Sequence, residues 1–105
     1  MRLASAALLS LCCAAAAPGA QEPPGRAKAQ ACAACHGTVG ISSTPDAPHL
    51  AGQPRIYLVQ QMRAFRSGKR AHEVMNVVAK PLSDVDIEEL ADWYASLVVE
   101  AREKR

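Results

Sequence analysis

Apolar residues recur at helical spacing in the middle of the chain. Pro54 suits the first turn of a helix there, and Gly68 suits its end. The apolar face of this predicted helix consists of Ile56, Leu58, Val59, Met62 and Phe65. The pattern therefore predicts one amphipathic helix between Pro54 and Gly68.

A second helical pattern begins at Ser83, which suits an N-cap because Asp86 follows three residues later as a variant of the capping box. We expect the helix to run to about Val98–Arg102. Its predicted buried residues are Ile87, Leu90, Ala91, Tyr94 and Leu97.

The remaining segments divide into one short helix and two loops. Residues 26–34 are rich in alanine and predict a helix. Residues 37–49 are rich in Gly, Ser and Pro and predict a loop, as does the segment 69–82, which contains Met75 and Pro81. No segment alternates like a strand, so the predicted fold class is all-α.

The amino-terminal residues resemble a targeting signal. A positive start is followed by an uncharged apolar run over residues 3–17 and by small residues at 18–20. We therefore interpret residues 1–20 as a signal peptide, 21–25 as a linker and 26–105 as the folded domain. An uncleaved anchor and lipidation at Cys12 or Cys13 are alternatives, although Leu11 before Cys12 is not the small residue that lipidation requires.

A domain of about 80 residues has a marginal hydrophobic core, so a covalently bound cofactor would stabilise it. The formal net charge of +2 shows none of the basic excess of a nucleic-acid-binding protein. Charges are nevertheless segregated. The basic run consists of Arg55, Arg63, Arg66, Lys69 and Arg70, and the acidic run of Asp84, Asp86, Glu88, Glu89 and Asp92.

Two interpretations of the basic run remain open. It could form a solvated helix face, or it could steer an acidic redox partner.

The sequence from Cys32 to His36 reads Cys-Ala-Ala-Cys-His, the attachment signature of c-type haem. Two intervening residues let one helical turn present both sulfurs to the haem vinyl groups, and His36 can then bond to the iron. A thioredoxin-like site would need a βαβ pattern, which this sequence lacks. A zinc site would need two further ligands, and only His49 and His72 are available.

Several blocks beyond the haem signature are similar to small bacterial class I cytochromes c. They are Pro48–Gln53, Tyr57–Leu58, Gln61, Phe65–Gly68, Met75, Leu82–Asp84, Asp86–Ile87 and Leu90–Ser96. The resemblance covers about Ala29 to Leu97. It implies three to four short helices around one haem c, with the amino- and carboxy-terminal helices crossing over one haem edge.

The resemblance also implies a sixth iron ligand and a set of supporting residues. The family places its ligand seven residues before the Leu-Ser-Asp helix start, which corresponds to Met75. His72 is the alternative ligand, while Met62 has the spacing of a core residue. Pro48 matches a proline whose carbonyl accepts the Nδ1–H of the ligating histidine. The residues expected to line or close the haem crevice are Leu50, Tyr57, Phe65, Leu90 and Trp93.

An iron with His36 and Met75 as axial ligands has no open position, which indicates electron transfer and not catalysis. The sequence therefore predicts a periplasmic one-electron carrier that docks transiently with redox partner proteins. One alternative is a haem subunit of a larger dehydrogenase or oxidase, with association to a membrane complex. A ligand-binding cytochrome is the other, if Met75 is not coordinated. The sequence does not specify the oligomeric state.

Overall fold

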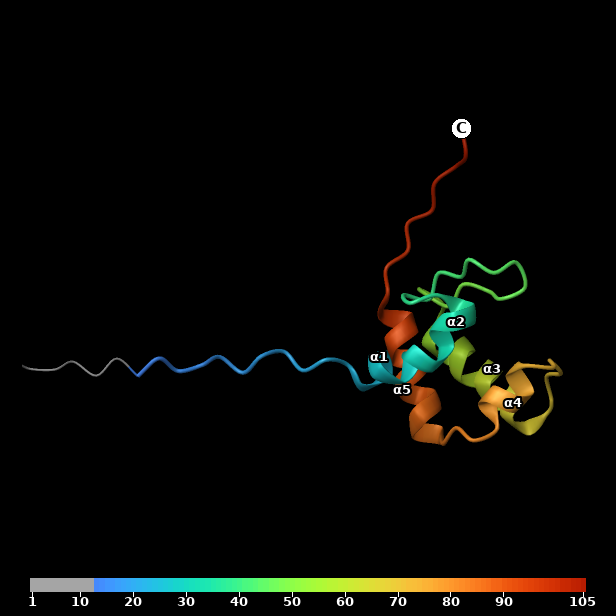
Figure 1. The fold of residues 1–105 in the computed structure, drawn as a ribbon, viewed down its shortest axis with the longest axis horizontal. Helices are drawn as coiled ribbons and strands as arrows, with labels where there is room; N and C mark the ends of the chain where they lie inside the picture. The colour runs from blue at the N-terminus through green and yellow to red at the C-terminus, as the bar shows by residue number, and fades with distance from the viewer. Residues whose placement is uncertain (1–12) are drawn as a thin grey trace, which may run out of the picture.

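The computed structural model describes residues 13–105 (Figure 1). In that part of the chain, every regular element is helical. The helices are α1 (Pro24–Lys28), the 3₁₀ helix η1 (Ala29–Cys32), α2 (Ala33–His36), α3 (Arg55–Ser67), α4 (Met75–Ala79) and α5 (Asp84–Ser96). The predicted all-α fold class is confirmed. None of these helices is long and apolar enough to cross a membrane.

The two predicted long helices are confirmed, as are both end signals of α3 and the start signal of α5. The predicted end of α5 near Val98–Arg102 was wrong, because Leu97 has an extended backbone and the helix ends at Ser96. Pro54 is the N-cap of α3, and Gly68 ends that helix in the left-handed conformation, with φ of 83°. At the start of α5, the Ser83 hydroxyl accepts a hydrogen bond from Asp86 N at 3.1 Å, and Ser83 N donates to Asp86 Oδ2 at 2.9 Å. Both ends of α3 and the start of α5 thus lie at residues that satisfy or restrict the terminal backbone.

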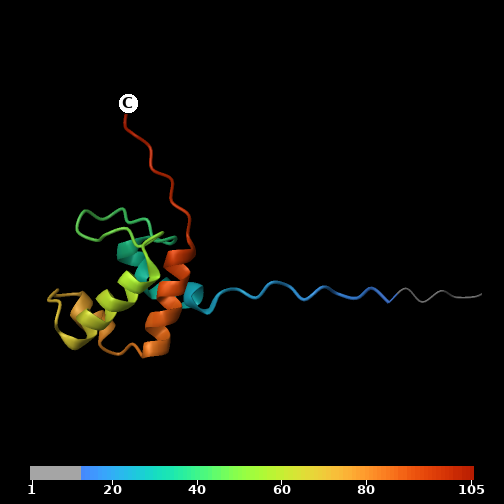
Figure 2. The same ribbon diagram turned by 180° about the vertical axis from the view of Figure 1, so that it is seen from behind.

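The hydrophobic core lies where α5 packs against α1 and α3, and α3 also contacts α4 (Figure 2). Gly25 allows the close crossing of α1 and α5, because a Cβ atom there would lie 1.9 Å from the Glu89 carbonyl oxygen. Lys28 then bridges to Asp86 at 2.6 Å and to Glu89 at 2.5 Å. The buried core residues are Ala29, Leu58, Val59, Ile87, Leu90, Ala91 and Tyr94.

Three other local predictions were wrong. The first helix begins at Pro24, inside the predicted linker, and continues to His36 as three short segments; Pro24 fits the first helical turn, and Gly25 is buried against α5. The predicted loop 69–82 contains α4. Ile56 is 70% exposed and lies outside the buried face of α3. The predicted signal peptide falls largely on residues 1–12, outside the described part of the chain.

Candidate functional site

Cys32, Cys35 and His36 lie within one continuous helical stretch, at the end of η1 and in α2. Cys32 is half-buried and Cys35 is exposed, and neither forms a disulfide bond. Burial raises the pKa of the Cys32 thiol, which keeps it protonated at neutral pH. Reactive redox cysteines have lowered pKa values, so Cys32 lacks the main physical property of a thiol–disulfide active site.

Among the described residues, His36 is buried at 8% exposure, whereas the other buried side chains are apolar or aromatic. Its Nδ1 atom lies 2.9 Å from the Pro48 carbonyl oxygen. Because a carbonyl only accepts hydrogen bonds, this contact places the proton on Nδ1 and leaves the Nε2 lone pair free to bind a metal. His36 therefore has the tautomer that iron ligation through Nε2 requires.

The loop between α2 and α3 is held in place by side-chain hydrogen bonds. Ser42 Oγ and Thr44 Oγ1 donate to the Cys35 carbonyl at 2.8 and 3.0 Å. Ser42 N donates to His49 Nδ1 at 2.8 Å, and Gln53 Nε2 donates to the His49 carbonyl at 2.5 Å. These bonds restrain the backbone on both sides of Pro48, which gives His49 a structural function that the sequence did not indicate.

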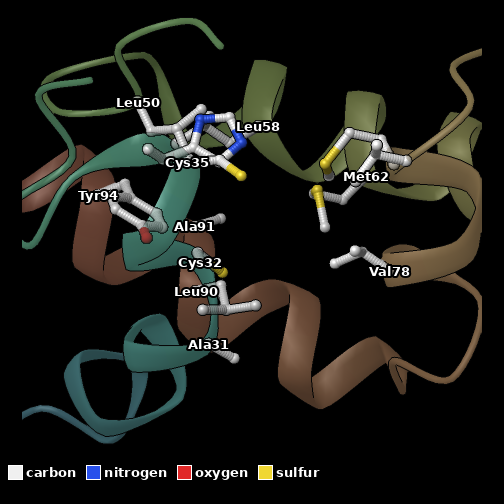
Figure 3. A pocket seen from close by; sticks show the side chains of 13 residues that line it. Ala31, Cys32, Cys35, Leu50, Leu58, Met62, Val78, Leu90, Ala91 and Tyr94 are labelled. Atoms are coloured by element: carbon white, nitrogen blue, oxygen red, sulfur yellow. The ribbon is translucent and has the colours of Figure 1, made fainter. Parts of the chain in front are cut away.

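Two adjoining cavities, of about 90 and about 300 Å³, lie beside this stretch. Figure 3 shows Met62 and Val78 across the smaller cavity from Cys32, Cys35 and Leu90. The residues that line both cavities are Cys35, His36, Leu50, Leu58, Met62, Val74 and Met75. An apolar space lined by two thiols, an imidazole and thioethers fits the donor set and the hydrophobic body of a covalently bound haem.

Met75 is the first residue of α4, and it is half-buried. Met62 on α3 also lines both cavities, but it packs against the buried core as well. His72 lines only the larger cavity, and its Nδ1 atom accepts backbone N–H groups at 3.2 Å from Val74 and Met75. Met62 and His72, the two alternatives to Met75 as an iron ligand, are thus each engaged elsewhere, Met62 with the core and His72 with backbone N–H groups.

Most of the residues expected at the crevice line the cavities. Leu50, Tyr57 and Phe65 line the larger one, and Leu90 lines the smaller. Trp93 lines neither; it lies beside Gly25 at the crossing of α1 and α5, so this prediction was wrong. Val74 and Val78, which no sequence signal indicated, also line the site, from the segment that was predicted to be an irregular loop.

Apart from Cys32, Cys35 and His36, the polar side chain at the smaller cavity is that of Tyr94, whereas Thr44, Asp46, Gln53, Gln61 and Arg70 line the larger one. The Tyr94 hydroxyl is buried next to Cys32, and burial is the main reason that the pKa of Tyr94 lies above its usual value. Within residues 13–105, no three His, Cys, Asp or Glu side chains converge on one point.

Much of the basic run is paired with the acidic run between α3 and α5. Arg63 contacts Asp84 at 3.6 Å and Glu88 at 3.3 Å, and Arg66 contacts Asp84 at 2.7 Å. Arg55 pairs with Asp92. The two runs therefore form an interface between helices, and the steering of a partner by the basic run stays a prediction.

A family model described as Cytochrome c matches residues 24–97. Cytochrome c4 of Pseudomonas aeruginosa is 44% identical over 72 residues, which cover 69% of this chain and 36% of that protein. The thiosulfate dehydrogenase electron acceptor of Thiomonas intermedia is 43% identical over 96 residues, which cover 90% of this chain and 43% of the relative.

A solved structure of cytochrome c4 from Acidithiobacillus ferrooxidans has the same fold, with a TM-score of 0.67 and 33% identity. The match covers 70% of this chain and 47% of the solved chain. The chain thus spans less than half the length of these three relatives.

Proposed function

The chain belongs to the cytochrome c family, whose cofactor is covalently bound haem c with its iron, and we propose that it is an exported carrier of single electrons. The observation that carries the proposal is the combination of Cys32, Cys35 and a buried His36 at one apolar cavity, with Met75 at the same cavity. The cofactor would supply the one-electron Fe(III)/Fe(II) couple.

In this proposal Cys32 and Cys35 attach the cofactor, and His36 is one axial ligand. The Pro48 carbonyl holds the His36 ring in the required orientation and tautomer. Met75 is the other axial ligand, because its side chain lines the cavity and lacks the core contacts of Met62. Thioether ligation raises the reduction potential relative to bis-imidazole ligation.

The other cavity residues then have a supporting role. Leu50, Leu58 and Leu90 exclude water, which keeps the surroundings of the iron apolar in both oxidation states. With both axial positions filled by His36 and Met75, no position remains for a substrate. The chain itself would therefore transfer electrons without catalysing a further reaction.

We place the protein in the periplasm, since residues 1–20 have the pattern of a leader and precede a domain that carries a c-type attachment signature. Its partners would be redox proteins that dock transiently, because redox encounters use small interfaces.

A second candidate function is a haem subunit that works with a larger enzyme. One observation favours it: a relative named as an electron acceptor for thiosulfate dehydrogenase matches 90% of this chain. Isolation of the native protein separates the two candidates. A fixed enzyme subunit would co-purify with its partner, whereas a mobile carrier would be obtained alone.

The carrier function is tested on the exported, haem-loaded protein. Its mass should exceed that of the processed polypeptide by one haem, and acid–acetone should not extract the cofactor. The oxidised protein should show the weak near-infrared band of a sulfur–iron bond, and Met75→Ala should abolish that band, lower the potential and permit carbon monoxide binding.

Two variants serve as controls. Met62→Leu preserves the side-chain volume, and His72→Asn removes the imidazole but retains a hydrogen-bond acceptor; both should keep the band. A band that persists in Met75→Ala, or a wild type without one, would overturn the assignment of Met75 and favour a ligand-binding cytochrome.

A further inference from the structure

The backbone just before α4 makes cap-like hydrogen bonds with a histidine, although the N-cap position itself is Val74. His72 Nδ1 accepts hydrogen bonds from the backbone N–H groups of Val74 and Met75, two and three residues later, each at 3.2 Å. An N-cap side chain makes the same pair of contacts, although Ser, Thr, Asp and Asn are the usual residues at that position. The imidazole of His72 therefore satisfies the backbone at the residue whose side chain reaches the cavity.

Asn76 ties the same segment to the end of α3. Its Oδ1 atom accepts from His72 N at 2.7 Å. Its Nδ2 atom donates to the carbonyls of Phe65 and Arg70, each at 2.8 Å. An asparagine side chain has one carbonyl and two N–H donors, so all of its groups are engaged.

The His72 ring is also held by aromatic contacts. It meets the Phe65 ring edge to face, with centroids 6.3 Å apart and an interplanar angle of 74°. The Arg70 guanidinium lies 4.5 Å from the centroid of the Phe65 ring. The Phe65 contact favours the direction in which His72 presents Nδ1, since edge-to-face aromatic pairs prefer this geometry, and Arg70 packs on Phe65.

The helix that carries Met75 is poorly suited to hold itself in place. It has five residues, which is too short for stability on its own. Val77 is 72% exposed, and Ala79 is the only residue of α4 that is fully buried. The position of Met75 must therefore depend strongly on the hydrogen bonds of His72 and Asn76.

We propose that His72 and Asn76 are positioning residues that hold the Met75 sulfur at the cavity and keep it bound to the iron. The inference rests on the proposed function, because it assumes that Met75 is the sixth ligand. Neither residue touches the iron; each acts through the backbone of residues 72–76. Loss of their hydrogen bonds should shift the equilibrium towards molecules in which Met75 has left the iron.

The size of this shift can be measured with carbon monoxide, which binds reduced iron only when Met75 has left. Apparent affinity for carbon monoxide is proportional to the population of that open state. Removing the three contacts of Asn76 should raise this affinity roughly tenfold, the equivalent of one to two net hydrogen bonds. Asn76→Ala should also lose its near-infrared band at a lower temperature than the wild type.

Three variants separate positioning from general destabilisation. His72→Ala should behave like Asn76→Ala, whereas His72→Asn should restore carbon monoxide affinity near the wild-type value, because asparagine can cap the helix. Ser83→Ala removes the capping box of α5 and lowers global stability, but it should leave carbon monoxide affinity unchanged. Wild-type affinity in Asn76→Ala, with lowered stability, would overturn the proposal.

Failure of the proposed function can be distinguished from failure of this positioning proposal, because in the former case the wild type itself would lack the near-infrared band. If Asn76→Ala does not fold, hydrogen exchange in the wild-type holoprotein decides the proposal. The amides of Val74 and Met75 should then be protected by His72 Nδ1. Exchange of both amides at the rate of an unstructured peptide would overturn it.

Discussion

The crossing of α1 over α5 makes Gly25→Ala an informative substitution. A Cβ atom at Gly25 would lie 1.9 Å from the Glu89 carbonyl oxygen and 2.9 Å from Trp93 Cβ. Ordinary contacts begin at 3.4 Å, so the two helices would have to separate by roughly 1.5 Å, the difference between 3.4 and 1.9 Å. The nearest obstacle is backbone, which cannot rotate away as a flexible side chain can.

The expected cost follows from two opposing effects. Overpacking of a close contact costs about 1–3 kcal/mol, and the upper end applies because the obstacle is backbone. Alanine gains about 1 kcal/mol over glycine within a helix. The net loss of about 2 kcal/mol should lower the Tm of a domain of this size by roughly 8–16 °C.

The assay is thermal unfolding of the haem-loaded protein, followed by far-ultraviolet circular dichroism. Gly68→Ala is the matched control, because a Cβ atom there meets nothing within 4 Å but the backbone has a positive φ of 83°. It should lose about 1 kcal/mol through strain alone, or roughly 4–8 °C. A Gly25→Ala variant as stable as the wild type, or more stable, would refute the close crossing of α1 and α5.

Two further predictions concern charged groups. Bonds from Lys28 and Ser83 lower the pKa of Asp86 from 3.8 to about 2, so its stabilising contribution is complete above pH 4 and is lost as the pH falls towards 2. The difference in Tm between the wild type and Lys28→Met should therefore shrink between pH 5 and pH 2, and a constant difference would contradict this. In urea unfolding, Arg63→Gln should lower the free energy of unfolding by less than about 1 kcal/mol, whereas Arg66→Gln should lower it by about 1.5 kcal/mol. Arg66 also donates to the Leu82 carbonyl, at 3.0 Å, and equal costs would show that this bond adds nothing.

The sequence predicted those features that depend on neighbouring residues. The apolar spacing from Leu58 to Phe65 predicted α3, and Ser83 with Asp86 predicted the start of α5. These signals are reliable because a helix buries every third or fourth residue and needs a cap. The attachment signature likewise placed both cysteines and His36 in one helical stretch.

Features that depend on distant residues could not be predicted. Helix α4 has five residues and no apolar period, and its N-cap position is Val74, which has no capping side chain, so each local signal favoured a loop. The pairing of Arg63 with Glu88 depends on how α3 packs against α5. Trp93 has the spacing of a core residue, but only the crossing at Gly25 shows that it faces α1 and not the cavity.

The two sides of the site are consequently built in different ways. His36 belongs to a helical stretch that begins in α1, which packs against α5 over a buried core that includes Ala29 and Leu90. Met75 begins a short helix that is anchored by the side chains of His72 and Asn76. Segments with few buried apolar contacts open at lower free-energy cost than the core does. We therefore expect the Met75 side to open first, and the hydrogen bonds of the α4 segment, more than the core, to set how firmly the proposed sixth ligand is held.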